Sequence, residues 1–252
     1  MFSIVFPIAP NRLELFKNSK KIYDSYPQDK EFIILTLHFN EVEKYLIDNN
    51  LTKNVTLIEY NLDIFTNPSM ALNIGVRNSK YNHIIITSPE VMPKTNVLPQ
   101  LETLLGNNVI CQVFDQSADG REFSLVNKNH RGHDPSMYFL AMFNKSDVEA
   151  INGWDEEFMK GYAIEDIDFG GRWIRAGLPF EVREDIQAVH QYHPRSETIH
   201  NGEAINAQLF YDNRDNNVIY CKNGLITDNI IKDSPIYKNK YILRTHIWNI
   251  TD

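Results

Sequence analysis

Short apolar segments alternate with amphipathic segments over the first two thirds of the chain. Apolar runs that predict buried strands occupy residues 2–8, 31–37, 55–60, 83–87, 109–114, 138–143, 180–182 and 188–194. Segments with hydrophobic residues at helical spacing lie between these runs, starting near residues 13, 42, 67, 96, 145 and 165. Strands alternating with helices are typical of an open, mostly parallel sheet. We therefore expect a single α/β domain over residues 1–252, with helices on both faces of the sheet.

The segment 152–177, NGWDEEFMKGYAIEDIDFGGRWIRAG, combines acidic, aromatic and glycine residues before and within a predicted helix. Glu165 and Asp166 lie in the first turn of that helix, where free backbone N–H groups favour carboxylates. One interpretation is that both acids only cap the helix. Asp166 also shares a helix face with Gly170 and Trp173, and the glycine leaves room for a ligand to approach the carboxylate.

Two further acidic positions each have a simple interpretation. Asp168 and Arg172 are four residues apart, which predicts a solvated ion pair on the helix surface. Glu90 follows the apolar run 83–87, which is expected to be a central strand. Ligands of open α/β sheets bind beyond the carboxyl ends of strands, so Glu90 is either at the mouth of a crevice or an ordinary surface acid.

Composition and charge narrow the classes of partner. The formal net charge of −8 argues against nucleic acid or an anionic membrane as the main partner. No run approaches the roughly 20 apolar residues that a membrane helix needs, and Met1 leads into an apolar strand without a basic segment. Cys111 and Cys221 are too few for a disulfide framework and lack metal-ligand spacing. We expect a cytoplasmic protein with reduced cysteines.

Two regions are harder to interpret from the pattern. Residues 115–135 are polar, carry His130, Arg131 and His133, and predict a long loop near the functional site. The tail from residue 197 is rich in Asn, Tyr and Lys, and we expect it to be irregular.

Several of these features together resemble a known family. They are a first strand that ends at Pro7, the Asn73-x-Gly75 helix, the acidic turn after the strand 83–87, and GWDEEFMKGYAIEDIDFGGRWIRAG. With them, the chain resembles nucleotide-sugar glycosyltransferases of GT-A fold, close to glycosyltransferase family 2 and the C-terminal region of β-galactosyltransferase-like enzymes. The resemblance covers roughly residues 2–194. It implies a nucleotide-sugar-binding half at 2–115, an acceptor and catalytic half at 136–194, and a C-terminal extension at 195–252.

The resemblance also implies roles for individual residues. In inverting members the aspartate of the Glu-Asp pair is the general base, which here is Asp166, while Glu165 and Trp154 would bind the acceptor sugar. Pro7, Ile8, Arg12 and Asn73 match positions that contact the donor. Asp115 is a weaker candidate for contact with the donor sugar, and Trp173 could stack on a sugar or belong to the core. The acidic residue that usually follows the second strand is absent from Leu37-His38-Phe39-Asn40, so the nucleotide base stays open.

A divalent cation, Mn²⁺ or Mg²⁺, is the cofactor that the resemblance implies. Family members bind it through an Asp-x-Asp motif, but this chain has Ser88-Pro89-Glu90 at that place, with one carboxylate. Glu90 and His190, with His193 as the alternative, would form the metal site. A histidine at either position could equally be an ordinary core or surface residue. The single carboxylate leaves open whether the metal is essential.

The leading hypothesis is an inverting, metal-dependent glycosyltransferase that acts on a glycan or glycoconjugate acceptor. The alternative is a non-catalytic GT-A-like protein that binds a glycan or a nucleotide-sugar. Retaining chemistry also stays open. A sugar nucleotidylyltransferase is disfavoured, because those enzymes use a glycine-rich basic loop and residues 7–21 contain no glycine.

Overall fold

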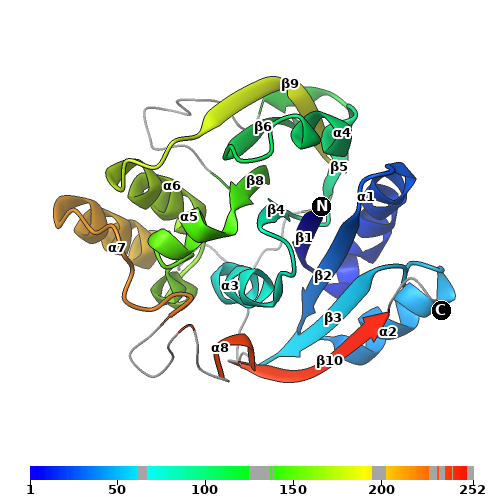
Figure 1. Ribbon diagram of the computed structural model, residues 1–252, viewed down its shortest axis with the longest axis horizontal. Coiled ribbons are helices and arrows are strands. Elements are labelled where there is room, and N and C mark those ends of the chain that lie inside the picture. Colours follow the sequence, from blue (N-terminus) through cyan, green and yellow to red (C-terminus); the bar gives the residue numbers. More distant parts are fainter. Residues whose placement is uncertain are drawn as a thin grey trace.

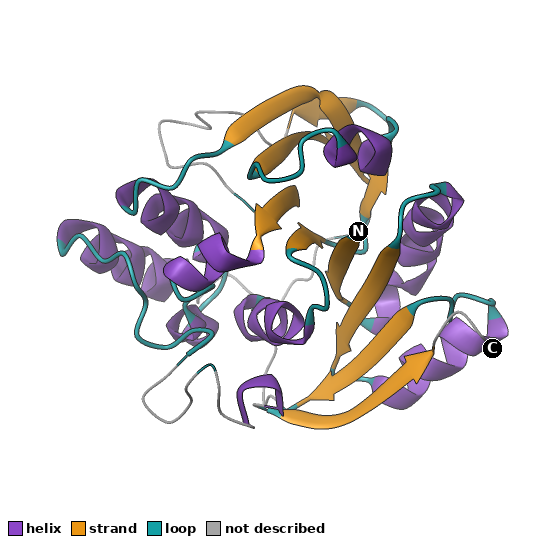
Figure 2. Cartoon of the chain, in the orientation of Figure 1, coloured by secondary structure: helices purple, strands orange, loops and turns teal. Residues whose placement is uncertain are grey.

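The computed structural model describes residues 1–61, 67–124, 137, 139–194, 203–226, 232, 236–239 and 241–248. Its strands are β1 (Phe2–Pro7), β2 (Lys30–Thr36), β3 (Val55–Tyr60), β4 (His83–Thr87), β5 (Val91–Pro93), β6 (Val109–Gln116), β7 (Glu122–Ser124), β8 (Leu140–Asn144), β9 (Glu181–His190) and β10 (Ile242–Trp248). Its helices are α1 (Leu13–Ser25), α2 (Phe39–Asp48), α3 (Ser69–Asn78), α4 (Val97–Glu102), α5 (Lys145–Ala150), α6 (Glu165–Arg175), α7 (Glu203–Asp215) and α8 (Ile236–Asn239). Two 3-10 turns, η1 (Pro10–Arg12) and η3 (Glu156–Lys160), precede α1 and α6. Figure 2 shows helices packed around one twisted sheet.

The described strands form one sheet in the order β10-β3-β2-β1-β4-β8-β6-β9-β5, with β7 paired to β6. Strands β1, β2, β3, β4, β6 and β9 run in one direction, and the other four run against them. Helices α1 and α2 lie on one side of the strands β1 to β3, and α3 lies on the other side (Figure 1). The expected three-layer α/β fold with a mostly parallel sheet is confirmed.

The centre of the sheet is buried on both faces. All six residues of β1 are buried, as expected of a strand covered by helices on two sides. Helix α3 packs so closely on β1 that a Cβ atom added at Gly75 would lie 2.3 Å from Cγ1 of Val5. The glycine of Asn73-x-Gly75 is therefore required by the contact between helix and sheet.

The C-terminal region contains regular structure, contrary to our expectation of an irregular tail. Helix α7 packs on α6, and β10 pairs antiparallel with β3. The predicted strands 180–182 and 188–194 are replaced by the single strand β9, whose register with β6 shifts between Cys111 and Gln112. Of the predicted loop 115–135, residues 125–135 lie outside the described part of the chain, with His130, Arg131 and His133 among them.

Among the described residues, each helix is too short or too polar to cross a bilayer.

Candidate active site

Four strands bring chemically active side chains to one edge of the sheet. Strands β1, β4, β6 and β9 share one direction, so their carboxyl ends lie at the same edge. Arg12 follows β1, Glu90 follows β4, Asp115 lies near the end of β6, and His190 is the last residue of β9. We call these four residues together with His193 the strand-end cluster. Its position agrees with the general rule that ligands of α/β sheets bind beyond the carboxyl ends of strands.

Arg12 and Glu90 form an ion pair in this cluster. Nε of Arg12 lies 2.6 Å from Oε1 of Glu90, and their side chains are only 16% and 12% exposed. The backbone N–H of Gln191 donates to the carbonyl oxygen of Glu90 at 2.9 Å, which joins this turn to the end of β9. The structure thus places a predicted donor-binding residue directly against a predicted metal ligand.

His190 and His193 both lie at the cluster. Nδ1 of His190 is 3.1 Å from Oδ1 of Asp115, and Nε2 of His193 is 3.8 Å from Oε1 of Glu90. Burial lowers the pKa of His190, although the carboxylates of Glu90 and Asp115 act to raise it. A neutral imidazole that donates from Nδ1 to Asp115 keeps the lone pair of Nε2 for another partner, and second-shell carboxylates orient metal-binding histidines in this way.

The residue types at the cluster fit a divalent cation such as Mn²⁺, which accepts carboxylate and imidazole ligands. Within the described ranges, however, no group of three or more His, Cys, Asp or Glu side chains is arranged to hold a metal ion. The ion pair with Arg12 occupies Glu90. Arg12 contacts Oε1, one of the two carboxylate oxygens of Glu90.

The remaining predicted donor contacts lie deeper in the protein. Pro7 and Ile8 are buried, and the N–H of Ile8 donates to the carbonyl oxygen of Leu35 at 2.7 Å. Asn73 is fully buried, and its amide bonds both the N–H and the carbonyl of Trp154 as well as Glu156. In this structure Asn73 fixes the loop before η3.

Glu165 and Asp166 begin α6, as predicted. Glu165 is 6% exposed, and burial together with the neighbouring carboxylate of Asp166 raises its pKa to about 8. Asp166 is half-buried, and its Oδ1 accepts the N–H of Ile167 at 2.9 Å. One oxygen of Asp166 thus caps the helix.

The backbone before this pair is strained. Ala163 (φ 55°) and Ile164 (φ 73°) both adopt the left-handed conformation, which costs a residue with a side chain roughly 1–2 kcal/mol. A β-branched residue in this region is unusual and points to a constraint from surrounding structure. Neither residue is a glycine, so no residue type at these two positions predicts a left-handed turn.

The Asp168–Arg172 pair forms as predicted but is not solvated. Both side chains are fully buried, and Nε of Arg172 lies 2.7 Å from Oδ2 of Asp168. The guanidinium also donates to the carbonyl oxygens of Ile151 and Gly153 at 2.8 Å. The expectation of a surface pair was wrong because Asn213 of α7 covers Asp168, and the segment with Ile151 and Gly153 covers Arg172.

Trp154 and Trp173 are core residues in this structure. Trp154 is fully buried, and its ring stacks on Phe169 with centroids 4.1 Å apart. Trp173 is fully buried against Phe143 at 4.9 Å. Neither ring face is available for stacking on a sugar, so the expected acceptor contact of Trp154 does not match its position here.

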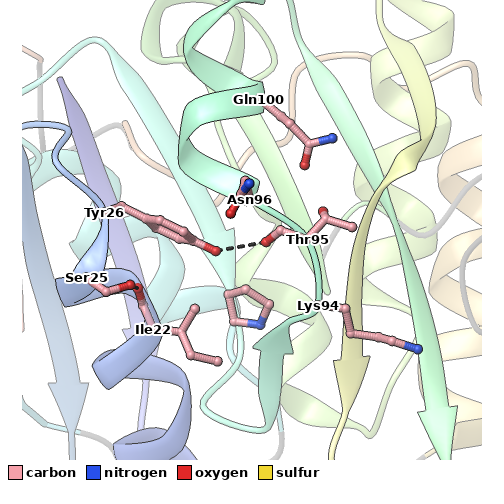
Figure 3. Close-up of a pocket in the computed structure, with 8 residues that line it drawn as sticks. Ile22, Ser25, Tyr26, Lys94, Thr95, Asn96 and Gln100 are labelled. Carbon is pink, nitrogen blue, oxygen red and sulfur yellow. Dashed lines mark hydrogen bonds between the residues drawn. The ribbon is translucent and has the colours of Figure 1, made fainter.

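A separate open hollow lies between the last turn of α1 and the segment that joins β5 to α4 (Figure 3). The hydroxyl of Tyr26 donates to the carbonyl oxygen of Thr95 at its wall, at 2.8 Å. Arg12 precedes the other end of α1, and a helix of 13 residues is about 20 Å long. The hollow therefore lies at the end of α1 away from Arg12.

Solved structures of similar fold include known glycosyltransferases. S. aureus TarS (residues 1–349) is similar with a TM-score of 0.60 and 9% identity, over 75% of this chain and 60% of that one. The mannosyltransferase PcManGT from Pyrobaculum calidifontis, in complex with GDP-Man and Mn²⁺, gives a TM-score of 0.57 and 15% identity, over 77% and 58%. The chain has the GT-A glycosyltransferase fold. It spans about 60% of the length of these GT-A structures.

One of the two sequence comparisons found a match, over part of the chain. Residues 124–195 match the family model described as the N-terminal domain of galactosyltransferase. This segment contains Glu165, Asp166 and His190 and is less than a third of the chain. No curated protein matches the chain.

Proposed function

We propose that this protein is an inverting glycosyltransferase that moves a sugar from a nucleotide-sugar to a hydroxyl group of a glycan or glycoconjugate. The observation that carries the proposal is the Glu165–Asp166 pair at the start of α6 in a GT-A fold, with Glu165 buried and Asp166 half-buried. The pair lies within the segment that matches the galactosyltransferase model.

The two carboxyl groups support different roles. With a pKa of about 8, Glu165 is mostly protonated at neutral pH, so it can donate a hydrogen bond to an acceptor sugar. In this proposal Asp166 is the general base. It would take the proton of the acceptor hydroxyl while the oxygen attacks the anomeric carbon and the bond to the diphosphate breaks. General base catalysis of this kind typically contributes about 10²–10⁴ in rate.

The strand-end cluster supports binding of the donor. Arg12 supplies a guanidinium suited to phosphate, and buried Pro7, the last residue of β1, and buried Ile8 lead to it. Structures of TarS contain UDP or UDP-GlcNAc, and PcManGT contains GDP-Man. By analogy, this chain would also bind a nucleotide-sugar donor. The proposal does not specify the base of that nucleotide.

Glu90 and His190, or Glu90 and His193, would hold a divalent cation, Mn²⁺ or Mg²⁺. A bound cation would stabilise negative charge on the nucleoside diphosphate leaving group. Release of Arg12 from Glu90 would expose both groups together: the carboxylate to the cation and the guanidinium to a phosphate. The PcManGT complex with Mn²⁺ supports this cofactor by analogy.

One observation favours the second candidate, a non-catalytic protein that binds nucleotide-sugar or glycan. Glu90 stands alone where the family has two aspartates, and Arg12 already neutralises it. Turnover of any donor distinguishes this candidate from the enzyme.

A thermal-shift panel of UDP, GDP, CDP and dTDP, each with and without Mn²⁺, tests the proposal first. We expect one nucleotide to raise the melting temperature only when Mn²⁺ is present, and Glu90→Gln to abolish that shift. The matching nucleotide-sugar is then assayed for transfer and hydrolysis. Stabilisation by a nucleotide without metal would contradict the proposed role of the cation in donor binding. Binding without turnover, across acceptors, would favour the binding protein, and no shift with any nucleotide would contradict the proposed donor.

A further inference from the structure

Helix α7 is attached to the turn that precedes the Glu165–Asp166 pair. Asn206 of α7 is fully buried, and its Nδ2 donates to the carbonyl oxygen of Ala163 at 2.7 Å and to that of Phe158 at 2.9 Å. The opposite amide orientation would place Oδ1 against two carbonyl oxygens, so the contacts fix its orientation. One side chain thus bridges both ends of the loop between η3 and α6.

The bridge acts on strained backbone. Ala163 accepts the bond from Asn206 and is itself left-handed, as is Ile164. The carbonyl oxygen of Ile164 accepts the N–H of Asp168 at 2.9 Å, so the left-handed turn feeds directly into the first turn of α6. Without the hydrogen bond to Ala163, relaxation of the turn to a conformation with negative φ would release strain. That change would move Glu165 and Asp166.

A second amide on the same face of α7 holds α6 one turn further on. Asn213 follows Asn206 by seven residues, which is two helical turns, and donates to Oδ1 of Asp168 at 3.0 Å. Phe210 lies between them on α7 and is 7% exposed. Phe210 therefore packs on the same face of α7 but makes neither of the two hydrogen bonds donated by Asn206 and Asn213.

We infer that Asn206 is a positioning residue for the reaction: it keeps the Ala163–Ile164 turn left-handed and thereby fixes the carboxyl groups of Glu165 and Asp166. The catalytic consequence rests on the proposed function. The structural consequence, a locked turn before α6, does not.

Asn206→Ala tests this inference, with Phe210→Ala as the matched control. Small displacements of catalytic groups cost up to about 10²-fold, so we expect kcat for transfer to fall about 10- to 100-fold in Asn206→Ala. The KM for the donor should change less than about threefold, because the strand-end cluster is untouched. Phe210→Ala should lower the melting temperature but keep kcat within about threefold of the wild type.

Hydrogen exchange measured by mass spectrometry on residues 158–168 gives a readout without turnover. We expect roughly tenfold faster exchange there in Asn206→Ala than in Phe210→Ala at equal loss of melting temperature. If Asn206→Ala does not fold, Asn206→Asp keeps the volume and removes the donating amide. Normal kcat and normal exchange in the Asn206 variant, or equal losses in Phe210→Ala, would overturn the inference. An inactive wild type would overturn only the proposed function, because the exchange comparison between the two variants would still test whether Asn206 locks the turn.

Discussion

The strand-end cluster and the Glu165–Asp166 turn are held by different kinds of structure. Four strands that share a direction deliver the cluster, and Arg12 pairs with Glu90 within it. The turn before α6 is held by an amide group from α7, and burial together with the neighbouring carboxylate of Asp166 raises the pKa of Glu165 to about 8. The cluster thus sets a guanidinium against a carboxylate, whereas the turn places two carboxyl groups side by side.

This difference suggests a division of labour. A donor diphosphate and a cation bring their own charges, so a cluster that holds an exchangeable ion pair suits them. An acceptor hydroxyl is neutral, and in the proposed function the carboxyl group of Glu165, whose pKa is raised, donates a hydrogen bond to it while Asp166 acts as the base. Variants that act on one region and not on the other test this contrast.

The largest expected effect is the loss of transfer in Asp166→Asn. Removing the base should reduce kcat about 10²- to 10⁴-fold. Donor binding measured by calorimetry should stay unchanged, because the strand-end cluster is intact. Asp48→Asn, on an exposed helix surface, is the control. Full transferase activity in Asp166→Asn would show that another group is the base.

Arg172→Met should cause the next largest effect, on stability. It leaves Asp168 buried without its cation, and breaking such a pair costs about 3–5 kcal/mol of unfolding free energy. Arg183→Met breaks an exposed pair with Asp185 and should cost less than about 1 kcal/mol. Urea unfolding curves measure both, and equal costs would show that the buried pair has no special role.

Glu165→Gln should change how stability depends on pH. Folding raises the pKa of Glu165 from 4.5 to about 8, so its contribution to stability is complete below pH 4.5 and is lost as pH rises to about 8. Relative to the variant, the wild type should lose at most about 1.4 kcal/mol per pH unit in that window. Glu157→Gln provides the contrast, because Lys160 lowers the pKa of Glu157 and its contribution is lost as pH falls. Parallel stability curves for the wild type and Glu165→Gln would contradict the raised pKa.

Asp115→Asn should have the smallest effect and should be confined to the strand-end cluster. The variant no longer orients His190 through a carboxylate, and such second-shell changes weaken metal affinity about 10- to 100-fold. Titration with Mn²⁺ measures the change, and Asp119→Asn on the exposed turn after β6 is the control. Equal Mn²⁺ affinity in wild type and Asp115→Asn would remove His190 from the proposed metal site.

The two regions also differ in how far the sequence predicts them. Glu90 was expected at this edge because ligands of α/β sheets bind beyond the carboxyl ends of strands, and the family resemblance implied Arg12 and His190 as donor and metal contacts. The left-handed Ala163–Ile164 turn has no glycine to mark it, and Asn206 lies in a tail without clear periodicity. The burial of Asp168 and Arg172 depends on α7 as well. Trp154 was misjudged because an aromatic residue near a site gives no sign of which way its ring faces.

The late position of α7 in the chain has a consequence for biosynthesis. A ribosome releases Glu165 and Asp166 about 40 residues before Asn206, and β10 emerges later still. The nascent chain thus has its parallel sheet strands before it has the amide that locks the turn and the strand that covers the edge of β3. On the inference drawn above, the turn before α6 is locked only after α7 has been synthesised, so the sheet can begin to fold before that turn is in place.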